Sequence, residues 1–493
     1  MASGSRIPQR RRLIKKYDIH FDEPAEYPFQ CPENWPATRG TLVRDVQTLG
    51  QSQYYQYRAS ISCDSLHRPW REQVRCRAEL VAILAQRCLV SRKNEPGWRY
   101  TVEVEIMARM SIEVACKKCR GRLWRSEQEV DPGIWQGRLR GDSGSVNRSG
   151  NHAPVIQANP GMTGKDESGI NPLFDCHIEE AIVYPPGLQS EMSKRDERPD
   201  RIYGLRSTRR LEHILSSIDK RPSAGGQCIG DSIASHPFRG DEEPAHFPFL
   251  VLEAKSEKGP DSFTDMEHQT AFAIRELLVL QENLRVAAGE GREWDAGPLV
   301  WFLSYKGEQW KVSIAYMETE NERKHFRVVQ LWRGAVNVRD GALQLLLIID
   351  YIFDWARDMY REVIIRSLRG LAVSDSVSLA YQDSDIFSTA AKERVRLWSV
   401  PNEDCETRGG PGHESAAIRD ALRSFDTKSG VIRDIRYIQT QFLGLYVTRD
   451  NLDAFLQSAD TEQESKALAL SLLTYLLEGW RVKGDTLDAL EFD

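Results

Sequence analysis

The sequence has few cysteines, lacks a bilayer-length apolar run and carries no excess of positive charge, and each shortage excludes a class of protein. Nine cysteines are scattered through 493 residues, and their odd number argues against a disulfide framework and for a reducing compartment. The apolar stretch at residues 343–349 is stopped by Asp350 and is too short to cross a membrane. No apolar segment follows the first methionine, so we expect an unsecreted, intracellular protein without a membrane partner.

The formal net charge of −6 comes from 72 acidic and 66 basic residues, so any contact with nucleic acid must be local. Basic residues concentrate at residues 6–16, a run typical of a nuclear-import signal, a phosphate-contacting arm or a solvated chain end. Cys116 and Cys119 form the only CxxC, without the second ligand pair that a structural zinc site needs, which argues against zinc.

Composition divides the chain into three parts. Residues 1–60 are basic and rich in proline, which predicts an extended N-terminal region. Residues 61–370 carry the sustained helical and strand periodicities of the main domain, interrupted by a Gly- and Ser-rich insertion at 136–172. Residues 371–493 are mainly helical in pattern.

The main domain alternates helical and strand patterns, which predicts a mixed α/β protein. Helical spacing covers residues 70–89, and a second helix is expected where Asn94 can cap and Pro96 suits the first turn. Later helices are expected to begin at a Thr264/Glu267 capping box and at Asp340. Strands are expected at residues 177–183, 200–206, 247–255, 298–305, 310–317 and 326–332.

The strand FPFLVLEAK ends in Glu253 and Lys255, two residues apart and therefore on the same face. Its run from Phe249 to Leu252 is apolar on both faces, as expected for a central strand of a covered sheet. Stranding two charges at the end of such a strand carries a desolvation cost, which a metal ion and a phosphate would offset. Upstream, Asp200 follows a proline at the start of another strand.

This Pro-Asp step followed by Glu-x-Lys resembles the PD-(D/E)XK, or restriction-endonuclease-like, nuclease superfamily. The resemblance implies an α-β-β-β-α-β core with a mixed central sheet flanked by helices, to which helical N-terminal and C-terminal additions are attached. The chain is especially similar to uncharacterised fungal proteins with a PD-(D/E)XK nuclease-like domain, which share the NE-x-x-W element at Asn94 to Trp98 and FPFLVLEAKS followed by an EHQTA-type helix. The resemblance covers roughly residues 85–370.

The resemblance implies a metal-dependent nuclease that hydrolyses phosphodiester bonds in DNA or RNA. Asp200 and Glu253 would bind Mg²⁺ or Mn²⁺, since hard cations prefer carboxylate oxygens, and Lys255 would lie beside the attacking water. Gln269 on the following helix, together with Glu95, would complete the site. The alternative function is a catalytically inactive nuclease-like fold that acts as a nucleic-acid or protein interaction module.

Three choices of residue stay open. Glu103 is an alternative to Glu95 as the acid of the first helix. A run of 52 residues separates Asp200 from Glu253, and we assign the excess to a helical insertion around residues 211–218. If that assignment is wrong, Asp231 or Asp241 becomes the metal-binding acid.

Tryptophans are plentiful in the main domain and have two interpretations. Their rings could stack on bases of a nucleic acid, or they could pack within the sheet and the long helix. Packing is the favoured interpretation for Trp301, Trp310, Trp332 and Trp355.

Overall fold

The structure is a computed structural model of the chain. It describes residues 6–373 apart from gaps at 33–34, 62–69, 112–123, 129–172, 193–197, 240–244, 258–261, 290–293, 295–296 and 321–322. The expected insertion at 136–172, the CxxC pair and nearly all of 371–493 lie outside these residues, so those expectations and the three-part division stay predictions.

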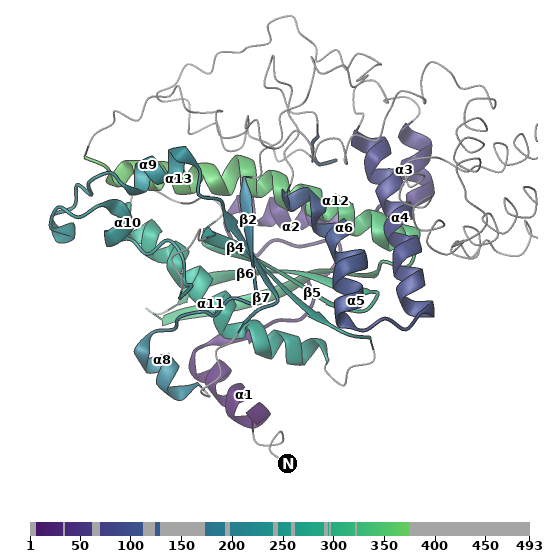
Figure 1. The fold of residues 1–493 in the computed structure, drawn as a ribbon, viewed down its shortest axis with the longest axis horizontal. Helices are drawn as coiled ribbons and strands as arrows, with labels where there is room; N and C mark the ends of the chain where they lie inside the picture. The colour runs from purple at the N-terminus through teal and green to yellow at the C-terminus, as the bar shows by residue number, and fades with distance from the viewer. Residues whose placement is uncertain are drawn as a thin grey trace, which may run out of the picture. The chain divides into compact units, whose positions relative to one another are not determined.

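The centre of the structure is a mixed sheet of seven strands in the order β1-β7-β6-β5-β4-β3-β2 (Figure 1). The strands are β1 Ile19–Phe21, β2 Phe174–Ile178, β3 Arg201–Leu205, β4 His246–Lys255, β5 Leu299–Lys306, β6 Gln309–Glu320 and β7 Arg323–Ala335. Strands β2, β3 and β4 form an antiparallel meander, and β5 then lies parallel to β4. A second meander adds β6 and β7, and β1 pairs parallel to β7 at the edge. The expected mixed α/β class is therefore confirmed.

Helices cover both faces of this sheet (Figure 1). One side carries α11 Phe263–Ala287, with α1 Arg6–Lys16 against it; the other carries α12 Arg339–Trp355, which packs on α2 Ala37–Leu49, α3 Tyr54–Ile61 and α4 Trp70–Val90. The remaining helical segments are α5 Glu95–Trp98, η1 Arg99–Glu103, α6 Val104–Met107, η2 Ala108–Ser111, α8 Pro186–Glu191, α9 Arg209–Leu215, η3 Pro222–Ala224, α10 Ile229–Ser232, η4 Ala356–Tyr360 and α13 Arg361–Leu371. Within the described part of the chain, no helix combines the length and apolarity needed to cross a bilayer.

Strand β4 is the buried centre of the sheet, as its apolar run predicts. Every residue from His246 to Ala254 is buried, and only Lys255 at the end is partly exposed. On one face, Val251 joins the apolar stripe of α11, including Phe272 and Leu277, in a single core cluster. This packing holds the end of β4 in a fixed place relative to α11.

The four tryptophans singled out in the sequence are packing residues, all at most 6% exposed. The rings of Trp301 and Trp355 meet edge to face at 5.7 Å, and Trp355 stacks on Tyr360 at 5.3 Å. Because the rings are buried, a nucleic-acid base cannot stack on them.

Two helix starts differ from the sequence expectation. The capping box of α11 is formed by Ser262 and Asp265, two residues before the expected pair of Thr264 and Glu267. The Ser262 hydroxyl accepts the Asp265 N–H, and the Asp265 carboxylate accepts the Ser262 N–H. Asp340 lies inside the first turn of α12 and accepts the Tyr54 N–H over 2.7 Å, so it ties α3 to α12 instead of capping its own helix.

The expectation of an extended region at residues 1–60 is wrong for the part that is described. The segment contains α1, β1, α2 and α3, because apolar side chains between its prolines and charges find a core to pack on. Ile14 and Ile19 are buried in the cluster beneath α11. The first strand of the β2-β3-β4 meander also begins earlier than expected, at Phe174, and ends at Ile178, because Glu179 has a positive φ of 52° that leaves the extended conformation.

Candidate active site

The end of β4 meets the start of β3, because the two strands run antiparallel. Their register places Arg201 opposite Leu252, and one step further Asp200 faces Glu253. The Asp200 N–H donates to Glu253 Oε2 over 3.4 Å, and the Ala254 N–H donates to Asp200 Oδ2 over 2.6 Å. The two acids singled out in the sequence are thus brought together, and the chain between them forms α9 and α10 as part of the expected insertion.

Glu253 is fully buried and is paired with Lys255, whose amine donates to Glu253 Oε1 over 2.6 Å. Burial raises the pKa of Glu253 to about 7; the charge of Asp200 adds to the rise and Lys255 opposes it. Burial alone would lower the pKa of Lys255. The negative charges of Glu253 and Asp200 raise it by more, so the pKa lies above its usual value. A carboxyl that titrates near neutrality next to an ammonium is frequent at functional sites.

Glu95 reaches the same place from the first helical elements. Asn94 caps α5 by accepting the Gly97 N–H over 3.1 Å, as its sequence predicts, and this fixes the first turn that carries Glu95. One helical turn later, the Arg99 guanidinium bonds to Glu95 Oε1 over 2.6 Å and, through the same nitrogen, to Asp200 Oδ1. Burial raises the pKa of Glu95, with a further contribution from Asp200. A single arginine therefore bridges two of the expected acids.

Arg99 and Glu179 belong to this cluster and were not singled out in the sequence. Arg99 also bonds to Glu179 Oε1 over 3.0 Å, and the Glu179 N–H donates to the Asp200 carbonyl over 3.3 Å. Glu179, directly after β2, therefore lies beside Asp200, directly before β3, so that acids from the ends of three neighbouring strands come together. The helical spacing of Glu95 and Arg99 was visible in the sequence, whereas Glu179 could be found only from the strand register.

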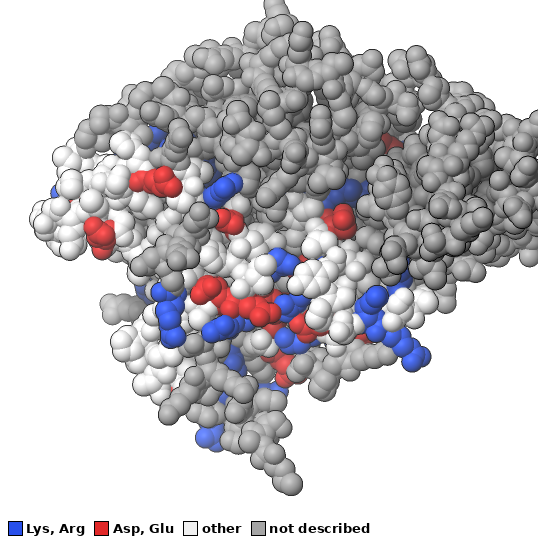
Figure 2. All heavy atoms as spheres, viewed as in Figure 1, with Lys and Arg blue, Asp and Glu red and all other residues white. Residues whose placement is uncertain are grey.

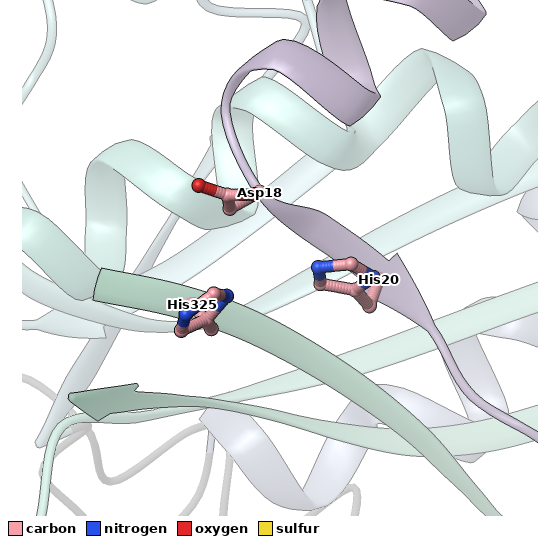
Figure 3. A group of neighbouring side chains, drawn as sticks. All are labelled: Asp18, His20 and His325. Atoms are coloured by element: carbon pink, nitrogen blue, oxygen red, sulfur yellow. The ribbon is translucent and has the colours of Figure 1, made fainter. Parts of the chain in front are cut away.

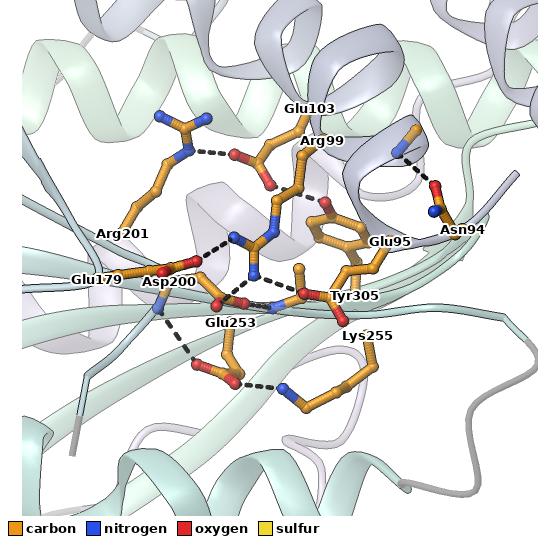
Figure 4. A network of polar contacts seen from close by, with 12 residues as sticks. Asn94, Glu95, Arg99, Glu103, Glu179, Asp200, Arg201, Glu253, Lys255 and Tyr305 are labelled. Carbon is orange, nitrogen blue, oxygen red and sulfur yellow. Dashed lines mark hydrogen bonds and ion pairs between the residues drawn. The ribbon is translucent and has the colours of Figure 1, made fainter. Parts of the chain in front are cut away.

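Figure 4 shows how these groups are divided about the strand ends. The Glu253 carboxylate and the Lys255 amine meet on one side, while Arg99 descends from the helix to Asp200, Glu95 and Glu179 on the other. Asp200 connects the two groups, because its carboxylate pairs with Arg99 and its backbone N–H donates to Glu253.

Glu103, the alternative to Glu95, has a different role. Its carboxylate accepts a hydrogen bond from the Tyr305 hydroxyl over 2.7 Å and pairs with the Arg201 guanidinium. Only 1% of Glu103 is exposed, and burial together with this carboxylate raises the pKa of Tyr305 well above its usual value. These contacts connect η1 to β3 and β5. Glu103 is therefore engaged elsewhere, and Glu95 is the acid that shares Arg99 with Asp200.

No hydrogen bond or ion pair among the described residues joins the remaining candidates to this cluster. Gln269 is half-buried on α11, where its backbone carbonyl accepts a hydrogen bond from Arg10 over 2.7 Å; among the described residues no hydrogen bond joins it to Glu253 or Lys255. Asp231 is exposed on α10 and makes no hydrogen bond or ion pair with Glu253 in the part of the chain that is described. Asp241 lies outside the described residues.

Carboxylates of Asp200, Glu253 and Glu95 lie near one end of the sheet, and oxygen ligands of this kind are those that Mg²⁺ and Mn²⁺ prefer. Among the described residues, however, these three acids do not form a group whose oxygens all lie within 4.8 Å of one another. The raised pKa of Glu253 means that a positive charge at this place would stabilise its ionised form. Arg99 and Lys255 supply that charge in the protein alone.

Comparison of the chain with models of protein families, with curated proteins and with solved structures gives no match.

Proposed function

We propose that the chain is a metal-dependent nuclease of the PD-(D/E)XK type, which hydrolyses phosphodiester bonds in DNA or RNA. The observation that carries the proposal is the convergence of Asp200, Glu253 and Lys255 at the ends of two adjacent strands, with Glu95 close by. The order of elements supports it, because a helix, three antiparallel strands, a helix and a parallel strand follow one another as the resemblance implies. Asp200 and Glu253 are the proposed ligands.

A divalent cation at these carboxylates would neutralise phosphate charge and lower the pKa of a water molecule. The protein's own groups would do the rest. Lys255 lies within reach of Glu253 and, once that carboxylate holds the cation, its three N–H donors are free to orient the water or to bond a phosphate oxygen. Arg99 would then turn from Asp200 toward the phosphate, to which its planar fork is suited.

Charge on the surface agrees with a locally bound nucleic acid. Figure 2 shows acidic and basic side chains intermixed on the visible face of the described residues. On this face, attraction of a phosphate backbone would come from particular side chains, such as Arg99 and Lys255, instead of from a broad basic patch.

The test is a cleavage assay of the full-length protein on single-stranded and double-stranded DNA and RNA, with Mg²⁺, with Mn²⁺ and with EDTA. We expect cleavage only with a metal, and its loss in Lys255→Met with the fold intact by circular dichroism. Lys306→Met is the matched control, because Lys306 is paired with Lys255 at the end of the neighbouring strand. Activity that persists in EDTA, or in Lys255→Met, would contradict the proposal.

A second function is favoured by one observation: Arg99 and Lys255 already pair with all four acids of the site. An ion-pair network of this kind could hold a nuclease-like fold together in a module that binds nucleic acid or protein without turnover. This function predicts binding of DNA or RNA, measured by fluorescence anisotropy, that neither requires a metal nor leads to cleavage.

A further inference from the structure

A second group of metal-ligating side chains lies at the opposite edge of the sheet. Asp18, His20 and His325 each offer one ligand atom, and these atoms all lie within 4.8 Å of one another. Figure 3 shows the three side chains at the junction of β1 and β7. The imidazole centroids of His20 and His325 are 6.1 Å apart.

Strand pairing explains why these residues meet. The parallel register places Ile19 opposite Phe326, and both are buried in the core cluster beneath α11. Side chains alternate along a strand, so His20 and His325, each next to one of these buried residues, lie on the outer face, and Asp18, which precedes β1 with a φ of 52°, lies beside them. The Phe326 N–H donates to the Asp18 carbonyl over 2.8 Å, which fixes the start of β1 against β7.

The chemistry of the cluster differs from that of the candidate active site. Two imidazoles with one carboxylate suit Zn²⁺ and other borderline first-row cations, whereas Mg²⁺ prefers oxygen ligands alone. Ligand atoms around a tetrahedral Zn²⁺ lie about 3.3 Å apart, given bonds of roughly 2 Å, so small side-chain rotations would close the present arrangement. Three protein ligands would leave the fourth position to water.

Neighbouring charges are compatible with a cation. Arg327, two residues along β7 from His325, is paired with Asp22 through two hydrogen bonds of 2.8 and 2.9 Å. Its positive charge is thereby balanced by Asp22 and does not oppose a cation at the cluster.

We propose that Asp18, His20 and His325 bind one Zn²⁺-class ion that fastens the N-terminal segment to β7. Asp18 and His20 come from the segment and His325 from the sheet, so the ion links chain positions about 300 residues apart. The segment includes α1, which contacts α11 and whose Arg10 bonds to the Gln269 carbonyl. Loading the site therefore stabilises the docked position of α1 on α11.

Co²⁺ is the probe, because its visible absorption reports the geometry and the ligands of the site. Titration of the full-length, metal-free protein should give one equivalent with the strong d–d bands of four-coordination and without a thiolate charge-transfer band, which separates this site from Cys116 and Cys119. Zn²⁺ should displace the Co²⁺. In His20→Ala and His325→Ala, the affinity for Zn²⁺ should fall by at least about 100-fold.

The controls separate this site from others. His213→Ala removes an exposed histidine on α9, and Glu253→Gln alters the candidate active site; both should keep the strong four-coordinate Co²⁺ bands of the wild type. Zn²⁺ should also slow proteolysis within residues 6–32 in the wild type and not in His325→Ala. Wild-type affinity in both single-histidine variants, or loss of the four-coordinate bands in Glu253→Gln, would overturn the proposal.

Discussion

The metal-free protein should be less stable at pH 8 than at pH 5 by an amount that depends on Glu253. Its pKa lies at about 7 in the folded protein against 4.5 ordinarily. Because the folded-state value is the higher one, the contribution to stability is fully present below pH 4.5 and is lost as the pH rises through 7. A rise of this size corresponds to about 3 kcal/mol, at roughly 1.4 kcal/mol per pKa unit.

The assay is urea denaturation in EDTA at pH 5 and pH 8, for the wild type and for Glu253→Gln, which cannot ionise. The free energy of unfolding of the wild type, relative to the variant, should fall by about 2 to 3 kcal/mol between the two pH values. The difference between the two proteins cancels the contribution of other titrating groups to the pH dependence. One such group is Asp350, whose pKa burial raises to about 6. Parallel pH curves for the two proteins would refute the reasoning.

A control and a second condition sharpen this test. Glu320→Gln changes an exposed carboxyl on β6 and should leave the pH dependence as it is in the wild type. Saturating Mn²⁺ should reverse the trend in the wild type, because a bound cation stabilises the ionised form of Glu253. The reversal should be absent in Glu253→Gln.

Other groups around the site give further predictions. Arg99→Gln removes the cation that pairs with the acids, so the affinity for Mn²⁺ should rise by about tenfold in calorimetric titration. Glu103→Ala leaves the Arg201 charge without its carboxylate, and urea denaturation should show a loss of about 3 to 5 kcal/mol. Gln281→Leu deprives the buried Leu299 N–H of its acceptor and should destabilise the protein by about 1 to 3 kcal/mol in the same assay.

Much of the fold could be predicted because its strands are marked by local patterns. The run that ends at Lys255 has apolar residues on both faces, and only a central strand buries both. The N-terminal region was misjudged because proline frequency reports local backbone preference, whereas Ile14 and Ile19 order the segment by packing in one core cluster with α11, about 250 residues away. Contacts at such separations leave no local trace in the sequence.

In the candidate site, too, local patterns could be predicted from the sequence and long-range contacts could not. Glu253 and Lys255 could be identified because two-residue spacing on a strand fixes a common face. Glu179 could not, because its place opposite Asp200 depends on the register of β2 against β3. The position of Gln269 likewise depends on the rotation of α11 about its axis, which is set by packing and by Arg10.

The short strand β1 has a consequence for how the protein behaves when it is shortened. Strand β7 has 13 residues, and its outer edge is covered by the chain from Ile19 onward, which continues past β1 with bonds from Asp22 and Ala25 to the Val328 and Gln330 carbonyls. Unpaired edges of this length recruit other chains into intermolecular sheets. A chain cut to residues 61–370 would expose that edge. Its aggregation would then result from the loss of the segment that pairs with β7, not from an unstable core.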